Sequence, residues 1–152
     1  MDYVKFCTNL SHKASEIMLK YFLQNNMQTH NKSDQTLVTL ADTTINKLVI
    51  DEVKKHYPEH GVLGEEETHN ASSKYLWVVD PIDGTSMFAA GIPTNVFAIA
   101  LCIDAKPVIS CVYSPYTKQL WISENGKATC NNLEIRCSNK EFAQDKRLLI
   151  GI

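Results

Sequence analysis

The run at residues 77–85 most constrains the fold of this chain, because it joins an apolar stretch directly to a turn that is rich in oxygen-bearing side chains. The first three residues, Trp-Val-Val, are aromatic or β-branched and predict a buried strand. Pro81 cannot donate a hydrogen bond to a neighbouring strand, so it predicts that this strand ends nearby. Asp80 is therefore expected at the exit of a buried strand.

The turn after this strand carries a second carboxylate, a glycine and a hydroxyl. Asp80 and Asp83 can converge only if the backbone turns sharply between them, and Gly84 has no side chain to keep a ligand away. Hard carboxylate oxygens grouped in this way favour Mg²⁺ over Zn²⁺. The alternative is that Asp-Pro and Asp-Gly are ordinary turn pairs, because aspartate bonds to nearby amides and glycine accepts a positive φ.

A second acidic cluster, residues 65–67, directly follows a short apolar stretch at 61–63. Three adjacent carboxylates repel one another, and a solvated loop is the simple interpretation. If the apolar stretch is a strand next to residues 77–79, Glu65 would meet Asp80 and Asp83. A bound cation would then relieve the repulsion.

Residues 64–66 and 77–85 resemble two signature stretches of the inositol monophosphatase family, which comprises Mg²⁺-dependent, lithium-sensitive phosphatases. Residues 32–34 and 37–42 resemble a third element from the N-terminal part of that family. The three elements stand in family order with family-like spacing, and the match runs through nearly the whole chain.

The resemblance implies a role for each matched residue. The implied metal ligands are Glu65, Asp80, Asp83 and the carbonyl of Ile82. The implied catalytic pair, which would orient and activate a metal-bound water, is Thr85 and Asp42. The implied phosphate-binding groups are the amides of Gly84 and Thr85. The implied supporting residues near the metal are Glu66 and Lys32.

Three of these residues also have structural interpretations. Thr39 and Asp42 fit a helix capping box, and that role is compatible with catalysis. After Asp-Gly, a residue such as Thr85 is typical of a turn or a helix cap. Lys32 taken alone is typical of a solvated surface lysine. Only the resemblance assigns these three to an active site.

The implied reaction is the hydrolysis of a phosphomonoester. Cations neutralise the dianionic ester and lower the pKa of the attacking water. Complete sites of the resembled family hold two or three Mg²⁺ ions, and an incomplete shell would hold fewer. The expected partner is a small phosphorylated metabolite such as inositol phosphate or histidinol phosphate. The alternative is a catalytically inactive remnant that acts as a metal-binding or dimerisation module.

Hydrophobic periodicity predicts the scaffold. Apolar residues recur at spacings of three and four over 4–22 and again over 45–53, so two amphipathic helices are expected. Strands are expected at 96–103, 108–113 and 120–123, and more weakly near Thr129 and Ile135. The predicted fold class is α+β, with two N-terminal helices packed on a largely antiparallel sheet. In the resembled family this is the N-terminal domain of a layered αβαβα fold, without its C-terminal α/β domain.

We expect one domain over residues 1–152, corresponding to the metal-binding domain of such an enzyme and truncated relative to it. Family members continue into a second domain, which supplies another metal-ligating aspartate and much of the substrate pocket. Without that domain, apolar surface would be exposed, which predicts a homodimer or other self-association.

Composition argues against several classes of partner. The chain has 152 residues and a formal net charge of −2, without a basic patch interleaved with aromatics, so no nucleic-acid partner is expected. No apolar run is long enough for a bilayer and the first residues do not begin a signal peptide, which predicts no membrane partner and a cytoplasmic location. The five histidines show no zinc-binding pairing and are expected on helix surfaces or in loops.

Overall fold

The computed structural model describes residues 2–22, 29–31 and 37–139. The helices in this part of the chain are α1 (Tyr3–Tyr21), α2 (Leu40–His56) and α3 (Thr85–Ala89). The strands are β1 (Thr29–Asn31), β2 (Leu37–Thr39), β3 (Gly61–Gly64), β4 (Thr68–His69), β5 (Tyr75–Asp83), β6 (Val96–Ile103), β7 (Lys106–Ser114), β8 (Gln119–Glu124), β9 (Lys127–Cys130) and β10 (Leu133–Ile135). Lys32, a predicted site residue, lies outside the described residues.

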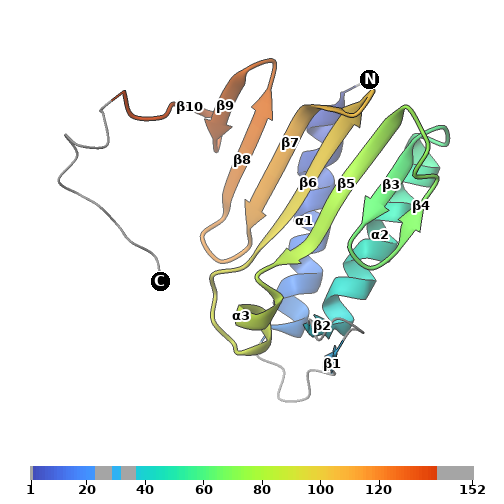
Figure 1. Ribbon diagram of the computed structural model, residues 1–152. Coiled ribbons are helices and arrows are strands. Elements are labelled where there is room, and N and C mark those ends of the chain that lie inside the picture. The colour runs from blue at the N-terminus through green and yellow to red at the C-terminus, as the bar shows by residue number, and fades with distance from the viewer. Residues whose placement is uncertain (1, 23–28, 32–36, 140–152) are drawn as a thin grey trace.

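Eight of these strands form one sheet in the order β10-β9-β8-β7-β6-β5-β3-β4 (Figure 1). From β5 to β10 each strand pairs antiparallel with the next along the chain. In contrast, β3 pairs parallel with β5, and β4 pairs antiparallel with the outer edge of β3. The predicted antiparallel meander is thus confirmed, and the β3–β5 pair makes the sheet mixed. The strands β1 and β2 form a separate two-stranded sheet.

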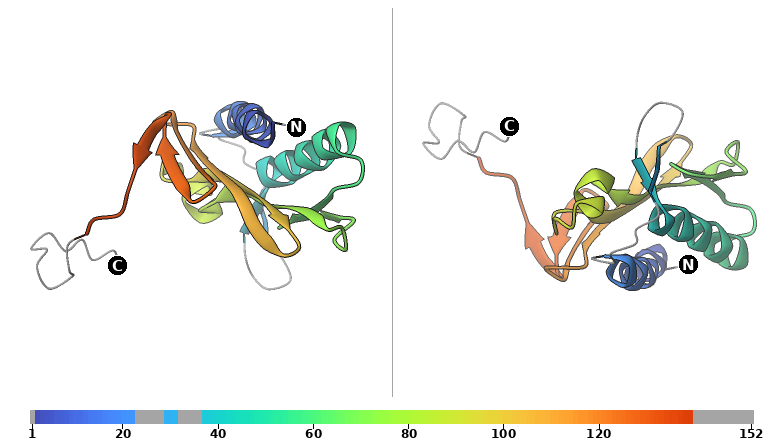
Figure 2. Two further views of the ribbon diagram at one scale, coloured as in Figure 1. Left: turned by 90° about the horizontal axis from the view of Figure 1, so that it is seen from above. Right: turned by 90° about the horizontal axis from the view of Figure 1, so that it is seen from below.

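The helices α1 and α2 both lie on one face of the large sheet (Figure 2). At the start of α1, the Asp2 carboxylate accepts a hydrogen bond from the Lys5 amide at 2.9 Å. At the start of α2, Thr39 and Asp42 form the predicted capping box, in which each side chain bonds to the other's backbone amide. The two predicted amphipathic helices and the α+β fold class are confirmed. No helix among the described residues is long and apolar enough to cross a membrane.

The hydrophobic core lies between the helices and the sheet. Alternate residues of β5 and β6 enter it, and Trp77 and Phe97 are both fully buried there. The helices contribute their apolar stripes, such as Ala14 from α1 and Ile45 from α2. Burying one large apolar side chain stabilises the fold by about 1.5–3 kcal/mol. This core therefore holds β5, which carries the acidic turn, firmly in place.

The opposite face of the sheet is not covered by the two long helices (Figure 2), and it carries apolar side chains of β3 and β5. In the β3–β5 ladder, Val62 pairs with Trp77 and both are fully buried. The next pair is Leu63 and Val78, whose side chains are 43% and 36% exposed. The alternation of a strand explains the difference, because successive side chains point to opposite faces.

One histidine is buried in its loop. The ring of His60 stacks between Tyr57 and Tyr75, with centroids 4.8 Å away on each side. Its Nδ1 accepts a hydrogen bond from the Trp77 indole N–H at 3.1 Å. Burial lowers the pKa of His60 from its ordinary value, because the charged imidazolium is poorly solvated there. His60 is therefore part of the core beside the start of β3.

Candidate metal and phosphate site

Parallel pairing brings the two acidic segments to the same end of the sheet. The β3–β5 ladder closes with Gly64 opposite Val79, so the next residues, Glu65 and Asp80, leave this register side by side. Figure 1 shows the end of β5 close to α3, and the end of β3 on the other side of β5, next to α2. The prediction that residues 61–63 form a strand next to residues 77–79 is confirmed. The prediction that this second strand ends near Pro81 is wrong, because β5 continues to Asp83 with a shift of register after Asp80.

Asp80 is the most electrostatically perturbed of these acids. Its side chain is half-buried, and its Oδ1 is a buried atom without a hydrogen-bond partner. The pKa of Asp80 is raised to about 7: burial is the largest cause, the charges of Glu65 and Asp83 and a hydrogen bond with Glu65 act in the same direction, and a hydrogen bond with the Ile82 backbone opposes them. A carboxylate oxygen that is desolvated, lacks a donor and faces like charges is a position where a cation would be strongly stabilising.

The other two acids lie at the surface. Glu65 and Asp83 are exposed, whereas Asp80 between them is half-buried. In the part of the chain that the structure describes, no three His, Cys, Asp or Glu side chains stand close enough together to enclose a metal ion. Binding an ion at Asp80 would thus require the Glu65 and Asp83 side chains to turn inward, which their exposed positions permit. The donor chemistry fits Mg²⁺, since every candidate side-chain ligand is a hard oxygen.

The predicted catalytic pair is in contact. The Thr85 hydroxyl donates to Asp42 Oδ1 at 3.2 Å and also reaches the Ile82 carbonyl at 3.0 Å. The carbonyl of Ile82, an expected metal ligand, is thus engaged by Thr85, although a carbonyl oxygen has a second lone pair for another partner. The pair joins the first turn of α2 to the first residue of α3.

Asp42 is almost fully buried, at 1% exposure. Its Oδ2 accepts hydrogen bonds from the Thr39 amide at 2.9 Å and from the Thr39 hydroxyl. Burial raises the pKa of Asp42, the bonds from Thr39 lower it, the charge of Glu66 raises it, and the bond from Thr85 lowers it. The capping role and the contact with Thr85 use different carboxylate oxygens, so both operate at once.

Gly84 starts α3 and has a backbone conformation that suits glycine. Its φ is +91°, in the left-handed region that side chains disfavour. Its carbonyl accepts from the Phe88 amide at 3.0 Å, which closes the first turn of the helix. The amides of Gly84 and Thr85, expected to hold phosphate, therefore lie at the N-terminus of this short helix, next to Asp83.

Asn95 and Tyr116 support this turn, and the sequence analysis did not find them. Asn95 is fully buried, its Nδ2 donates to the Ile92 carbonyl at 3.0 Å, and its Oδ1 accepts from the Tyr116 hydroxyl at 2.6 Å. A Cβ added to Gly84 would lie 3.4 Å from the Asn95 Cβ, so Asn95 occupies the space beside this glycine. Asn95 and Tyr116 are distant in sequence, so no local pattern links them. The only indication in the sequence was the polar Asn95 directly before the apolar strand β6.

Asn46 is the second residue that the sequence analysis missed. It is fully buried in α2, and its side chain bonds to the backbone of residues 64–67, which we call the acid loop. The available signal was an amide at a core-facing position of an otherwise apolar helical stripe, one turn after Asp42. Such an amide needs polar partners in the interior.

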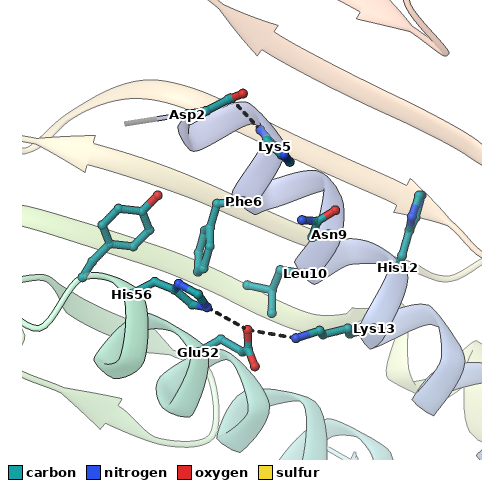
Figure 3. A pocket seen from close by; sticks show the side chains of 10 residues that line it. Asp2, Lys5, Phe6, Asn9, Leu10, His12, Lys13, Glu52 and His56 are labelled. Atoms are coloured by element: carbon teal, nitrogen blue, oxygen red, sulfur yellow. Dashed lines mark hydrogen bonds and ion pairs between the residues drawn. The ribbon is translucent and has the colours of Figure 1, made fainter.

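A cavity of about 480 Å³ lies between α1 and α2, away from the acids (Figure 3). Across it, Lys13 is 2.9 Å from the Glu52 carboxylate, and His56 is 3.6 Å from the same carboxylate. The hydrogen bond from Lys13 lowers the pKa of Glu52, and burial opposes that shift in part. Residues 65, 80 and 83 do not line this cavity, so it is separate from the acidic site.

The chain belongs to the inositol monophosphatase family, whose model matches residues 2–151. It is 34% identical over 128 residues to the bifunctional phosphatase IMPL2, chloroplastic, of Arabidopsis thaliana, covering 82% of this chain and 37% of that protein. It is 33% identical to inositol monophosphatase 2 of Solanum lycopersicum, covering 91% of this chain and 55% of that protein. It is 30% identical to the histidinol-phosphatase of Chlorobaculum parvum, covering 85% of this chain and 50% of that protein. The chain spans about half, or less, of the length of these curated relatives.

Solved structures of the family have the same fold. The IMPase of Thermotoga maritima superposes with a TM-score of 0.85 at 26% identity, covering 91% of this chain and 55% of that one. An IMPase/NADP phosphatase complexed with Mg²⁺ and phosphate superposes with a TM-score of 0.77 at 26% identity, covering 87% and 51%. A neighbouring member of the family thus binds the ion and the anion that the acidic site of this chain would suit.

Proposed function

We propose that this chain carries the metal- and water-binding residues of a Mg²⁺-dependent phosphomonoester hydrolase. The observation that carries the proposal is Asp80, whose buried Oδ1 lacks a partner and lies within the electrostatic reach of Glu65 and Asp83. Thr85, which is hydrogen-bonded to Asp42, follows Asp83 by two residues. Carboxylates alone would repel a phosphate ester, so the arrangement is productive only with a cation.

Each acid has a distinct part in this proposal. Asp80, Glu65, Asp83 and the Ile82 carbonyl would hold Mg²⁺, and Glu66 would add to the negative field around them. Bound Mg²⁺ supplies positive charge that neutralises the ester and lowers the pKa of water. Asp80 would be the central ligand, because it is the most buried of the three acids and the charges of both others act on it.

Thr85 would orient the attacking water. Its single hydroxyl hydrogen is used inside the protein, by Asp42 or the Ile82 carbonyl, so its oxygen can still accept a hydrogen bond from water. A water that donates a hydrogen bond to Thr85 is held in one direction, which supports an in-line displacement at phosphorus. Asp42 keeps the threonine in the required rotamer and is itself held by Thr39.

The proposed substrates are small phosphorylated metabolites. Relatives that match most of this chain are an inositol monophosphatase and a histidinol-phosphatase. Inositol phosphate and histidinol phosphate are therefore the first candidates, with the Gly84 and Thr85 amides contacting the phosphate. The phosphate group is common to these substrates, and it is the part that the proposed Mg²⁺ and the two amides would hold.

A second candidate is a catalytically inactive module that binds metal or dimerises. The specific observation in its favour is the exposed apolar strip on the sheet, including Leu63 and Val78. Exposed apolar surface of this kind is typical of an interface. Under this alternative the chain would bind Mg²⁺ or self-associate without turnover.

The deciding experiment is Mg²⁺-dependent phosphate release by the 152-residue chain from inositol, histidinol and nucleotide phosphates. Activity should disappear with chelator and in Asp83→Asn, a near-isosteric change that removes one ligand charge. The matched control is Asp51→Asn, at an exposed position of α2, which should keep full activity. Undiminished turnover in Asp83→Asn would refute its role as a ligand. Metal-induced stabilisation without turnover would favour the inactive module.

A further inference from the structure

One helix contacts both halves of the proposed site. In α2, Asp42 and Asn46 are one turn apart and lie on the same face of the helix. Asp42 contacts Thr85, which follows β5, whereas Asn46 contacts the acid loop, which follows β3. Because a helix is stiff over one turn, the spacing of these two side chains relates the position of the acid loop to that of the β5 turn.

Asn46 holds the acid loop through two backbone hydrogen bonds. Its Nδ2 donates to the Glu67 carbonyl at 2.9 Å, and its Oδ1 accepts from the Glu66 amide at 3.3 Å. The side chain is fully buried, so these bonds are shielded from competition with water. Both bonds hold the two residues that directly follow Glu65, and they thereby limit where the Glu65 backbone can lie.

Gly64 allows this close approach. A Cβ at Gly64 would lie 2.1 Å from Asn46 Oδ1 and 2.4 Å from the Glu67 carbonyl oxygen. Real Cβ atoms do not come so near to either group, so any side chain here would push the acid loop away from α2. The amide of Asn46 and the bare backbone of Gly64 therefore fit together as one contact.

The acids of the loop give a reason for such a device. Glu65 is exposed, and it repels Asp80 when both carboxyls are ionised, so without support the loop would then tend to move away from the β5 turn. Holding the backbone in advance reduces the entropy that is lost when the side chain turns to a cation. A simple core residue at position 46 would fill the same space but would leave the loop backbone without this attachment.

We infer that Asn46 is a positioning residue for the metal site: it clamps the acid loop to α2 so that Glu65 stays beside Asp80. The inference rests on the proposed function, because it assigns Asn46 a purpose at the Mg²⁺ site and not in the reaction itself. It predicts that Asn46 controls metal affinity without contacting the metal. Partners of this kind typically change metal affinity by roughly 10–100-fold when removed.

The test is a Mg²⁺ titration of the 152-residue chain by calorimetry, with the melting temperature of the metal-free protein recorded for each variant. Asn46→Leu keeps the size of the side chain and removes both bonds to the acid loop. The matched control is Val53→Ala, a fully buried position on the same helix outside the contact with the acid loop. This control lowers stability without touching the proposed clamp.

We expect Asn46→Leu to bind Mg²⁺ at least roughly tenfold more weakly than the wild type, while Val53→Ala binds with unchanged affinity. A folded Asn46→Leu variant with wild-type affinity would overturn the inference, as would an equal loss in Val53→Ala. If Asn46→Leu does not fold, Asn46→Ser serves instead, because its hydroxyl is too short to bridge both loop groups. Failure of both variants to fold would show that Asn46 serves the fold and not the site. Absence of Mg²⁺ binding by the wild type would refute the proposed function itself, and is thus distinct from these outcomes.

Discussion

The Thr85 hydroxyl lies 3.2 Å from the Asp42 carboxylate, to which it donates a hydrogen bond across a sequence separation of 43 residues. The bond connects the start of α3 with the first turn of α2. It directs the hydroxyl hydrogen into the protein and leaves the oxygen lone pairs for an outside donor. Under the proposed function this contact would separate two tasks at the site, since Thr85 would orient the water whereas the neighbouring acids would hold the metal.

Thr85→Ala should lower kcat by roughly 10²–10⁴-fold, the usual contribution of a group that assists proton transfer. Mg²⁺ affinity should change little, because the proposed function assigns Thr85 to the water and not to the metal. Steady-state kinetics and a Mg²⁺ titration on the same preparation measure both quantities. Ser86→Ala, at the exposed next position, is the control and should match the wild type. Equal losses of kcat and metal affinity would contradict this division of tasks.

Thr39→Ala should lower the free energy of unfolding by about 1 kcal/mol, which is typical for the loss of an N-cap side chain. The change removes the hydroxyl bond to Asp42 and so also removes one influence that lowers the pKa of that carboxyl. Urea unfolding measures the effect. Thr43→Ala, exposed in the same turn of α2, should stay within about 0.5 kcal/mol of the wild type. If Thr43→Ala lowered the free energy of unfolding as much as Thr39→Ala, the N-cap would not stabilise the protein more than an ordinary exposed threonine.

The stability of the metal-free protein should fall as the pH drops below the ordinary His60 pKa of 6.5. Burial lowers the pKa of His60 in the folded state, so between the two values the unfolded chain binds a proton that the folded chain does not. The contribution of His60 is fully present above 6.5 and is lost as the pH falls toward the lowered value. The rings of Tyr57 and Tyr75 and the Trp77 N–H leave no acceptor for an added proton.

Urea unfolding between about pH 7.5 and about pH 5 tests this dependence. In His60→Phe the part of the pH dependence due to this residue should vanish, whereas His69→Phe should retain it, since His69 is only half-buried. The same slope in His60→Phe and in the wild type would rule out His60 as the source.

Tyr116→Phe should lower the free energy of unfolding by about 1–3 kcal/mol, because it leaves the buried Oδ1 of Asn95 without its donor. Burial raises the pKa of Tyr116 to about 12, so the hydroxyl remains a donor at every physiological pH. Tyr75→Phe, in which the stacked ring next to His60 is kept, is the control. Thermal and urea unfolding report the difference. No loss in Tyr116→Phe would mean that Asn95 finds another partner in the variant.

The sequence alone determined the local features of this protein. The Trp-Val-Val stretch before Asp80, the Thr39–Asp42 capping box and the periodic stripes of α1 and α2 all depend on residues within a few positions of one another. Secondary structure and caps follow from such short-range patterns. The motifs also sufficed to indicate the family before any contact was known.

Only the tertiary structure decided which of these local features meet. The parallel register of β3 and β5 brings Glu65 beside Asp80, and packing of α2 on the sheet brings Asp42 to Thr85. The burial of Asp80 Oδ1 and the attachment of the acid loop by Asn46 also arise from this packing. The physical reason is that desolvation and long-range hydrogen bonds depend on the atoms that surround a group in space, and the spacing of residues along the chain does not specify those neighbours.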